Sequence, residues 1–509
     1  MRIVKNTARI LVFLVLLCVL LGALSDLLEQ KDSKAMLEPF LENAQEYDVL
    51  FLGDSQVRHG IYPLELYHKY GIASYDLASG NSRVPVTYWK MINALDYATP
   101  KLIVLSLTDI DLPELTYTKG EWLHVAFNGF PLSLNKARAI LDLTDQKGKD
   151  RNGVAYRDIG KELFFPLIKY HSRWNSLEET DFHPAYNMLK GAEPFVHVSD
   201  PHHGFQLVEQ DDCLPEEGYG FVYLRKIIEE CQKREIPLLL NQPPYPISAQ
   251  AHRGSHTAAK IAAEYGVPML NFPDMNSVVD YYIDCGDPGS HLNTSGAQKL
   301  TDYLGKYITD HYDLPDRRED PAYAHWDDEW NAYVDGKIRM ISEGADSLRA
   351  WLTLLHDEDF NVVLTVRPNF DYDFHNTKIA MQNVARPRVY EGDEQVSAEL
   401  KPLQGLNDAA EYNEGYMFIV DRDAESEYES VQEYYGIGEQ EFETSFGYVF
   451  CRMDGEWIDL SITPEDGEEV YYFDNWDDQD QDMHLVLIDR RTGKPALSMV
   501  RSRTEEDKL

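Results

Sequence analysis

Between residues 47 and 312, short apolar runs alternate with longer amphipathic stretches, and this alternation limits the possible folds more than any other feature of the chain. The apolar runs have the length of strands and lie at residues 48–52, 73–77, 102–107, 237–240 and 268–271. A parallel strand pair needs a long crossover, usually a helix, so strands that alternate with helices indicate a mostly parallel sheet. The pattern therefore predicts an α/β fold with helices on both faces of a parallel sheet.

The amphipathic stretches predict five helices between these strands, at residues 64–70, 86–95, 219–234, 248–265 and 295–312. The regular alternation breaks between residues 112 and 215, in an insert that is rich in aromatic residues. Long excursions from an α/β sheet commonly form lids or walls of a substrate site. We expect one domain over residues 40–315, with residues 112–215 as its insert.

The chain has 509 residues, which is too long for one typical hydrophobic core, so at least two domains are expected. A stretch rich in proline and charge at residues 313–321 is typical of a linker. A helix-like segment at 330–355 leads from it to short β-like runs at 360–366, 416–420, 446–452 and 483–488. These runs predict a smaller β-rich domain over residues 325–509.

The N-terminus has the pattern of a membrane-directed segment. Arg2, Lys5 and Arg9 precede an unbroken apolar run over residues 10–24, which places the N-terminus in the cytoplasm. The run is shorter than the ~20 residues of a comfortable span. An uncleaved signal anchor over residues 1–28 is favoured over a cleaved signal peptide with Ala23 and Ser25 at the cut. In both cases the rest of the chain lies outside the membrane.

The charge and the cysteines exclude several classes of function. A net charge of −40 repels nucleic acid, so we expect no nucleic-acid partner. The five cysteines are sparse and form no C-x-x-C pair, so neither a zinc site of that kind nor a dense disulfide framework is predicted, although a single disulfide is conceivable. We expect no metal and no cofactor.

The first predicted strand ends abruptly in Gly53-Asp54-Ser55, which places a hydroxyl at its carboxyl end. Open α/β sheets bind their ligands at that edge. Far downstream, Asp287 and His291 offer a carboxylate and a base just before the last predicted helix. A serine, a histidine and a carboxylate are the groups that acyl transfer through an activated hydroxyl requires. Asp54 is expected to be structural, because an aspartate in such a turn bonds local backbone N–H groups.

These motifs resemble the blocks of the GDSL/SGNH hydrolase superfamily. The Gly-Asp-Ser motif is similar to the first block, and Asp287 with His291 is similar to the last. The resemblance implies a three-layer, flavodoxin-like fold in which Ser55 is the nucleophile, His291 is the base and Asp287 orients the base. It also implies an oxyanion hole that is built from the backbone of Ser55 and of Gly80, which lies in the second block.

Two positions depart from the pattern of this family. The third block usually carries Gly-x-Asn-Asp, whose asparagine completes the oxyanion hole, but residues 105–111 contain no asparagine. We expect Asn81 to take that place. The family's aspartate usually lies three residues before the histidine, where this chain has Pro288. Asp287 is one residue further back, and Asp284 is the alternative.

A signal anchor before such a domain is similar to exported SGNH-like proteins that work beside membrane-bound O-acyltransferases, in teichoic-acid D-alanylation and alginate O-acetylation. This resemblance implies a bacterial protein, of Gram-positive type, that is held in the cell membrane by one span. It would pass an acyl group to a surface glycopolymer, with a membrane-bound O-acyltransferase as partner. The alternatives are a secreted carbohydrate esterase and a non-catalytic scaffold subunit.

Four further residues are candidates for substrate contacts. Arg58 and His59 follow the predicted nucleophile closely, and His171 and Arg173 lie in the insert beside Trp174. Cationic and imidazole side chains can bind an anionic or a sugar substrate. For the second pair, a packed aromatic cluster without a role in binding is an alternative.

Overall fold

The computed structural model describes residues 2–367, with gaps at 113–114, 116–118, 185–188, 200–203, 276–277, 280–282, 289–290, 346 and 356, and residues 414–502, with gaps at 433–437, 454–456, 466, 468–470 and 475–480. The chain divides into two compact units. The first contains residues 1–194, 202–278 and 299–330, and the second contains residues 195–201, 279–298 and 331–509. Residues 279–298, which we expected in the first domain, thus group with the second unit. Each unit is described by itself.

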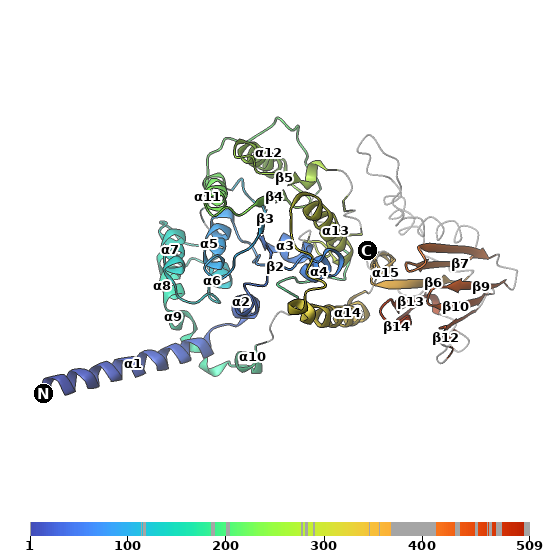
Figure 1. Cartoon of the computed structure of the whole chain (residues 1–509), viewed down its shortest axis with the longest axis horizontal. Coiled ribbons are helices and arrows are strands. Elements are labelled where there is room, and N and C mark those ends of the chain that lie inside the picture. The colour runs from blue at the N-terminus through green and yellow to red at the C-terminus, as the bar shows by residue number, and fades with distance from the viewer. Residues whose placement is uncertain are drawn as a thin grey trace. The chain divides into compact units, whose positions relative to one another are not determined.

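A five-stranded parallel sheet forms the centre of the first unit (Figure 1). Its strands are β1 (Val49–Leu52), β2 (Ser74–Asp76), β3 (Leu102–Ser106), β4 (Leu238–Gln242) and β5 (Met269–Asn271). They stand in the order β2-β1-β3-β4-β5, and every neighbouring pair is parallel. The five predicted strands and the parallel α/β sheet are confirmed. This order is that of a doubly wound sheet whose switch point lies between β1 and β3.

The predicted helices of the first unit are confirmed within two residues at each end, and Figure 1 shows them on both sides of the sheet. They are α4 (Pro63–Tyr70), α5 (Val84–Ala94), α11 (Tyr219–Lys233), α12 (Ala249–Glu264) and α13 (Thr294–His311), the last of which begins in the second unit. The sheet is apolar on both faces because helices cover both, so the strands read as continuous hydrophobic runs. All residues of β1 and β3 are buried.

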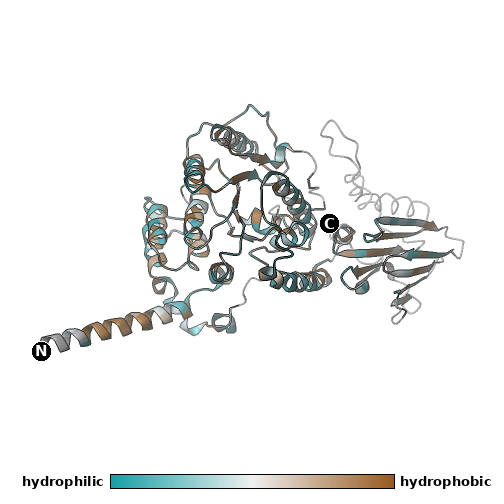
Figure 2. Cartoon of the chain, viewed as in Figure 1, coloured by the Kyte–Doolittle hydropathy of each residue, from teal (hydrophilic) through white to brown (hydrophobic). Residues whose placement is uncertain are grey.

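The insert is helical over its first part. Its elements are α6 (Glu121–Phe127), α7 (Leu134–Thr144), α8 (Tyr156–Phe164), α9 (Leu167–Tyr170), the 3-10 helix η1 (His171–Asn175) and α10 (Glu179–Phe182). The chain reaches the sheet through α1 (Arg2–Leu28) and α2 (Asp32–Glu42). Within α1, residues 9–28 are long and apolar enough to cross a membrane, as the brown colour in Figure 2 shows. This helix could be an anchor or a signal sequence.

The stretch that was predicted as a linker is bonded to the first unit. The Arg317 guanidinium donates to both carboxylate oxygens of buried Asp48, at 2.7 and 3.0 Å. The Arg317 backbone N–H also donates to the carbonyl of Gly71 at 2.9 Å. The charges of this stretch therefore anchor it beside the start of β1.

The second unit contains two antiparallel sheets, which confirms a β-rich C-terminal part. One sheet has the order β14-β13-β6-β7-β8 and the other β12-β11-β10-β9. Their strands are β6 (Phe360–Val366), β7 (Gly415–Asp421), β8 (Ser426–Gln432), β9 (Gly438–Thr444), β10 (Gly447–Met453), β11 (Ile458–Thr463), β12 (Tyr471–Asp474), β13 (Gln481–Asp489) and β14 (Lys494–Ser502). The 3-10 helix η3 (Pro321–Tyr323), then α14 (Ala324–Gly344) and α15 (Leu348–Leu354), precede β6.

One hydrophobic cluster joins the two sheets of the second unit. It takes Val363 and Ile419 from one sheet and Val449 and Leu460 from the other, all of them fully buried. Inward residues of β10 and β11 alternate with more exposed ones, as expected for strands with one face on a core. The unit is therefore a sandwich of two packed sheets.

Candidate active site

Ser55 is the first residue of α3 (Ser55–Gly60), directly after the carboxyl end of β1. Asp54 caps this helix, because its carboxylate accepts a hydrogen bond from the N–H of Gln56 at 3.0 Å. The structural role that we predicted for Asp54 is thus confirmed. Since β1 borders the switch point of the sheet, Ser55 lies at the edge where doubly wound proteins bind ligands.

Gly53 allows the turn between β1 and Ser55 to pack closely. A Cβ atom at this position would lie 2.7 Å from Cγ2 of Val57 and 2.9 Å from Cβ of Ser106. Both distances are shorter than carbon–carbon contacts in proteins, so only glycine fits here without a shift of the turn. The packing of the turn against α3 and β3 fixes the position of the serine backbone.

Gly80 and Asn81, the predicted oxyanion donors, lie in a loop that is bonded to the Ser55 turn. The N–H of Ser79 donates to the carbonyl of Gly53 at 3.3 Å, and the hydroxyls of Ser79 and Ser82 lie 2.7 Å apart. Asn81 has the left-handed backbone conformation, with φ 55°. The two loops are therefore held side by side, which is the arrangement that a two-donor oxyanion hole would need.

The loop after β3, where the family usually has an asparagine, contains one member of an ion pair. Asp109 follows β3 with φ 53°, and its carboxylate lies 3.4 Å from the guanidinium of Arg83. Arg83 is buried at the start of α5, which follows the Gly80 loop. This ion pair links the loop after β2, which contains Gly80, to the loop after β3. No sequence pattern had indicated it.

In the second unit, Asp287 and His291 are in direct contact. Nδ1 of His291 lies 2.8 Å from Oδ2 of Asp287, and the backbone N–H of His291 donates to Oδ1 at 3.1 Å. The loop is closed by the N–H of Gly286, which donates to the carbonyl of His291 at 2.7 Å. Asp284, the alternative acid, is instead buried and accepts a hydrogen bond from Ser295 at 2.8 Å. Asp287 is therefore the carboxylate that orients the imidazole.

Ser55 belongs to the first unit, and the pair of Asp287 and His291 belongs to the second. The predicted catalytic residues are thus divided between the two units. The approach of the serine hydroxyl to the imidazole stays a prediction.

Arg58 and His59 both contact Glu193 of the insert. The Arg58 guanidinium forms an ion pair with the carboxylate of Glu193 at 2.7 Å, and Nδ1 of His59 lies 2.7 Å from the Glu193 carbonyl oxygen. His59 is buried. These contacts hold residue 193 of the insert against α3.

His171 and Arg173 lie near the end of α1. Arg173 forms two hydrogen bonds of 2.8 Å with the carboxylate of Asp181 and a third of 2.8 Å with the carbonyl of Leu28. His171 is exposed, and its Nδ1 lies 3.1 Å from the carbonyl oxygen of Leu167. Arg173 thus joins elements of the insert, and Trp174 beside it is exposed rather than packed.

Two buried charged residues near the Gly80 loop, Asp76 and Lys90, were not among the predicted site residues. Asp76 ends β2 with no exposed surface, and Lys90 of α5 is 2 % exposed. Burial raises the pKa of Asp76 to about 7, against the opposing effects of the Ala78 N–H, Arg58 and Lys90. Burial lowers the pKa of Lys90 to about 7, although Asp76 opposes the shift. The available signal was a carboxylate, Asp76, inside the predicted strand at residues 73–77.

Asp76 makes the stability of the first unit depend on pH. Its pKa rises from 3.8 to about 7 on folding, so the folded state holds an extra proton between these values. Stability therefore falls as pH rises from about 4 to about 7. Asp76→Asn keeps an oxygen for the Ala78 N–H and is expected to flatten this slope in urea unfolding.

Lys90→Met is the matched control for Asp76→Asn. Lys90 has a folded pKa of about 7, below its ordinary value of 10.5, so it contributes a gain in stability between these pH values. Lys90→Met should lose the rise in stability above about pH 7 and keep the fall in stability between about pH 4 and 7. An unchanged slope in Asp76→Asn would show that another group causes it.

His252, His256 and Asp274 form a cluster whose ligand atoms all lie within 4.8 Å of one another. The sequence signal was the spacing of four between two histidines on a predicted helix, and we did not use it. The hydrogen bonds argue against metal binding, because Nδ1 of His252 accepts from the N–H of Val208 at 2.9 Å. The proton of neutral His252 then lies on Nε2, 2.7 Å from Asp274, where it donates to the carboxylate.

A scan against models of protein families and a search of curated proteins found no match for this chain. The fold and the two halves of the site describe an α/β protein with a serine at the switch point of a doubly wound sheet. The resemblance to the SGNH superfamily stays a prediction from the motifs.

Proposed function

We propose that this protein is an extracytoplasmic serine acyltransferase that acylates a cell-surface or exported glycopolymer. The observation that carries the proposal is the contact between Asp287 and His291. Because Nδ1 of the imidazole faces the Asp287 carboxylate at 2.8 Å, Nε2 is the nitrogen that serves as base. A carboxylate in this place fixes the tautomer and stabilises the imidazolium that forms when the base takes a proton.

The reaction has two halves. The Ser55 hydroxyl attacks the carbonyl carbon of the acyl donor while His291 takes its proton, and the imidazolium then protonates the leaving group of the donor. The acyl group is now esterified to Ser55. A hydroxyl of the glycopolymer next gives its proton to His291 and attacks the ester carbonyl, and the imidazolium returns that proton to the departing Ser55 oxygen.

The negative charge on the acyl oxygen needs donors in both halves of the reaction. The backbone N–H groups of Ser55 and Gly80 are assigned to this role, and the Asn81 amide is the third candidate. Loss of one such donor in a comparable enzyme costs about 3–4 kcal/mol of barrier, so a hole that lacks the family's usual asparagine depends on the remaining groups. The bond between Ser79 and Gly53 supports their arrangement.

The apolar helix α1 would keep the protein at the outer face of the cell membrane. There it would receive the acyl group from a membrane-bound O-acyltransferase, which is the partner that the family resemblance implies.

Labelling by a fluorophosphonate tests the activated serine directly. The full chain is expected to be modified at Ser55, as mapped by mass spectrometry of the peptides. Asp287→Asn should slow this labelling by roughly 10³- to 10⁴-fold, because the imidazole would be held in the wrong tautomer. Asp284→Asn is the matched control and should slow labelling far less, since the Asp284 carboxylate accepts a hydrogen bond from Ser295, whereas the Asp287 carboxylate contacts Nδ1 of His291.

Equal labelling rates of the wild-type protein and Asp287→Asn would contradict the proposed base. A serine that is not labelled at all would favour the scaffold subunit. Release of free acetate from an acetylated sugar, without transfer to an acceptor, would favour the esterase.

A further inference from the structure

Four large apolar side chains of the insert are exposed close together in the chain. Phe165 is 67 % exposed, Ile168 49 %, Trp174 71 % and Phe182 56 %. They lie on or beside α9, η1 and α10. Single exposed apolar residues need no explanation, but a set on neighbouring elements marks an interaction surface.

These elements lie beside the C-terminal end of α1. The helix α1 packs against α9, η1 and α10, and Figure 1 shows α9 and α10 where α1 joins the rest of the first unit. The bond from Arg173 to the carbonyl of Leu28 fixes this contact at the last residue of the apolar span. Asp181 of α10 holds the same guanidinium with two bonds of 2.8 Å. The exposed residues are therefore fastened to the end of the span.

The local charge differs from that of the whole chain. From the start of α7 to the end of α10, residues 134–182 contain nine basic and eight acidic residues, a net charge of +1 in a chain of net charge −40. An anionic lipid surface repels acidic protein surfaces within about a Debye length. This part of the first unit can thus approach such a surface without that repulsion.

We propose that Phe165, Ile168, Trp174 and Phe182 form an interfacial collar, which enters the headgroup region of the bilayer that α1 crosses. The inference rests on the proposed role of α1 as a retained anchor. Aromatic side chains gather where a span leaves the hydrocarbon, because their rings suit the mixed polarity of that zone. The collar and α1 together would hold the first unit in one orientation to the membrane.

Quenching by brominated lipids tests the collar with the full chain in liposomes. Bromine atoms at a shallow depth in the acyl chains are expected to quench part of the tryptophan emission. Trp174→Phe should abolish that part, whereas Trp457→Phe, a substitution in the second unit, should leave it. Thermal unfolding of both variants by circular dichroism confirms that they are folded.

Flotation of the liposomes separates failure of the anchor from failure of the collar. A chain that does not float with the vesicles would show that α1 is no anchor, and the collar would fall with it. A chain that floats, but whose Trp174 is reached by aqueous acrylamide and not by bromolipid, would overturn the collar alone. Shielding of Trp174 that needs a co-purified membrane protein would also overturn it and would assign the surface to that partner.

A spin label provides a second measurement that does not depend on tryptophan. Nitroxide at Ile168→Cys should be more accessible to oxygen than to a water-soluble nickel complex, whereas a label at Tyr219→Cys on α11 should show the reverse. Equal accessibility of the two labelled sites would contradict the collar.

Discussion

Replacing Ser55 by alanine is expected to abolish acylation of the surface polymer in cells that express the variant as their only copy. The substitution removes the hydroxyl that carries the acyl group and leaves the cap at Asp54 in place, because that cap uses the backbone N–H of Gln56. Loss of the nucleophile in a serine enzyme costs on the order of 10⁶-fold in turnover. The measurement is the acyl content of the polymer, normalised to the amount of protein in the membrane.

Ser426→Ala is the matched control for this experiment. Ser426 lies at the start of β8, and its hydroxyl bonds the nearby carbonyl of Ala424 at 3.0 Å. The control should leave polymer acylation at the wild-type level. Unchanged acylation in Ser55→Ala would end the serine mechanism, and the chain would then be a binding or scaffold protein.

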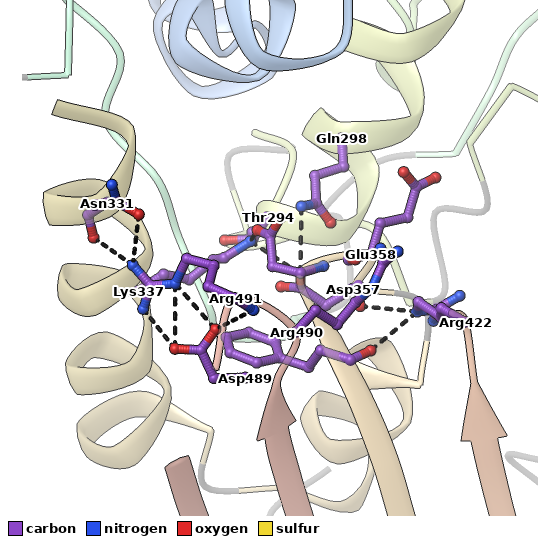
Figure 3. A network of polar contacts seen from close by, with 12 residues as sticks. Thr294, Gln298, Asn331, Lys337, Asp357, Glu358, Arg422, Asp489, Arg490 and Arg491 are labelled. Atoms are coloured by element: carbon purple, nitrogen blue, oxygen red, sulfur yellow. Dashed lines mark hydrogen bonds and ion pairs between the residues drawn. The ribbon is translucent and has the colours of Figure 1, made fainter. Parts of the chain in front are cut away.

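Lys337→Ala is expected to cause the largest loss of stability in the second unit. Lys337 of α14 has no exposed surface, and its ammonium group contacts the carboxylates of Asp357, at 2.9 Å, and of Asp359. Figure 3 shows Lys337 and Asp357 within a wider polar network that includes Gln298. Removal of the cation leaves two carboxylates without their counter-charge, which costs about 3–5 kcal/mol in comparable buried pairs.

Urea unfolding of the full chain, followed by tryptophan fluorescence, measures this loss. Arg452→Ala is the control in the same unit, because its ion pair with Glu439 spans 3.7 Å between side chains that are 35 % and 60 % exposed, and its guanidinium lies over the ring of Trp457. Exposed pairs of this kind contribute about 1 kcal/mol or less. A loss in Lys337→Ala no greater than that in Arg452→Ala would show that the buried cluster does not stabilise the unit.

The sheet and its helices could be predicted because local patterns determine them. The run at residues 48–52 is apolar at consecutive positions, as a strand covered on both faces must be, and β1 occupies residues 49–52. The strands of the sandwich were harder to predict. In β9, half-buried positions alternate with exposed glutamates, and Phe442 is the one large apolar residue among the half-buried ones, so the apolar period that marks a strand is missing.

The candidate site could be predicted only in part. Asp287 and His291 are four residues apart, and their contact follows from the short loop between them. The ion pair of Arg83 and Asp109 joins residues on separate loops, and the shifted pKa values of Asp76 and Lys90 come from burial that the completed fold imposes. Such features depend on the packing of distant segments, which one sequence does not reveal.

Residues of the second unit that are distant in the sequence support the loop of His291. Asn293 donates to the carbonyl of His197 at 3.3 Å, and Gln298 donates to Asp357 at 3.4 Å. A cavity beside this loop is lined by Ile341, Leu354 and Asp357 among others. A chain cut after α13 would keep every residue of the proposed catalytic set but would lose the contact of Gln298 with Asp357 beside the loop of His291. Contacts that support this loop therefore come from α14, α15 and Asp357, which follow α13 in the chain.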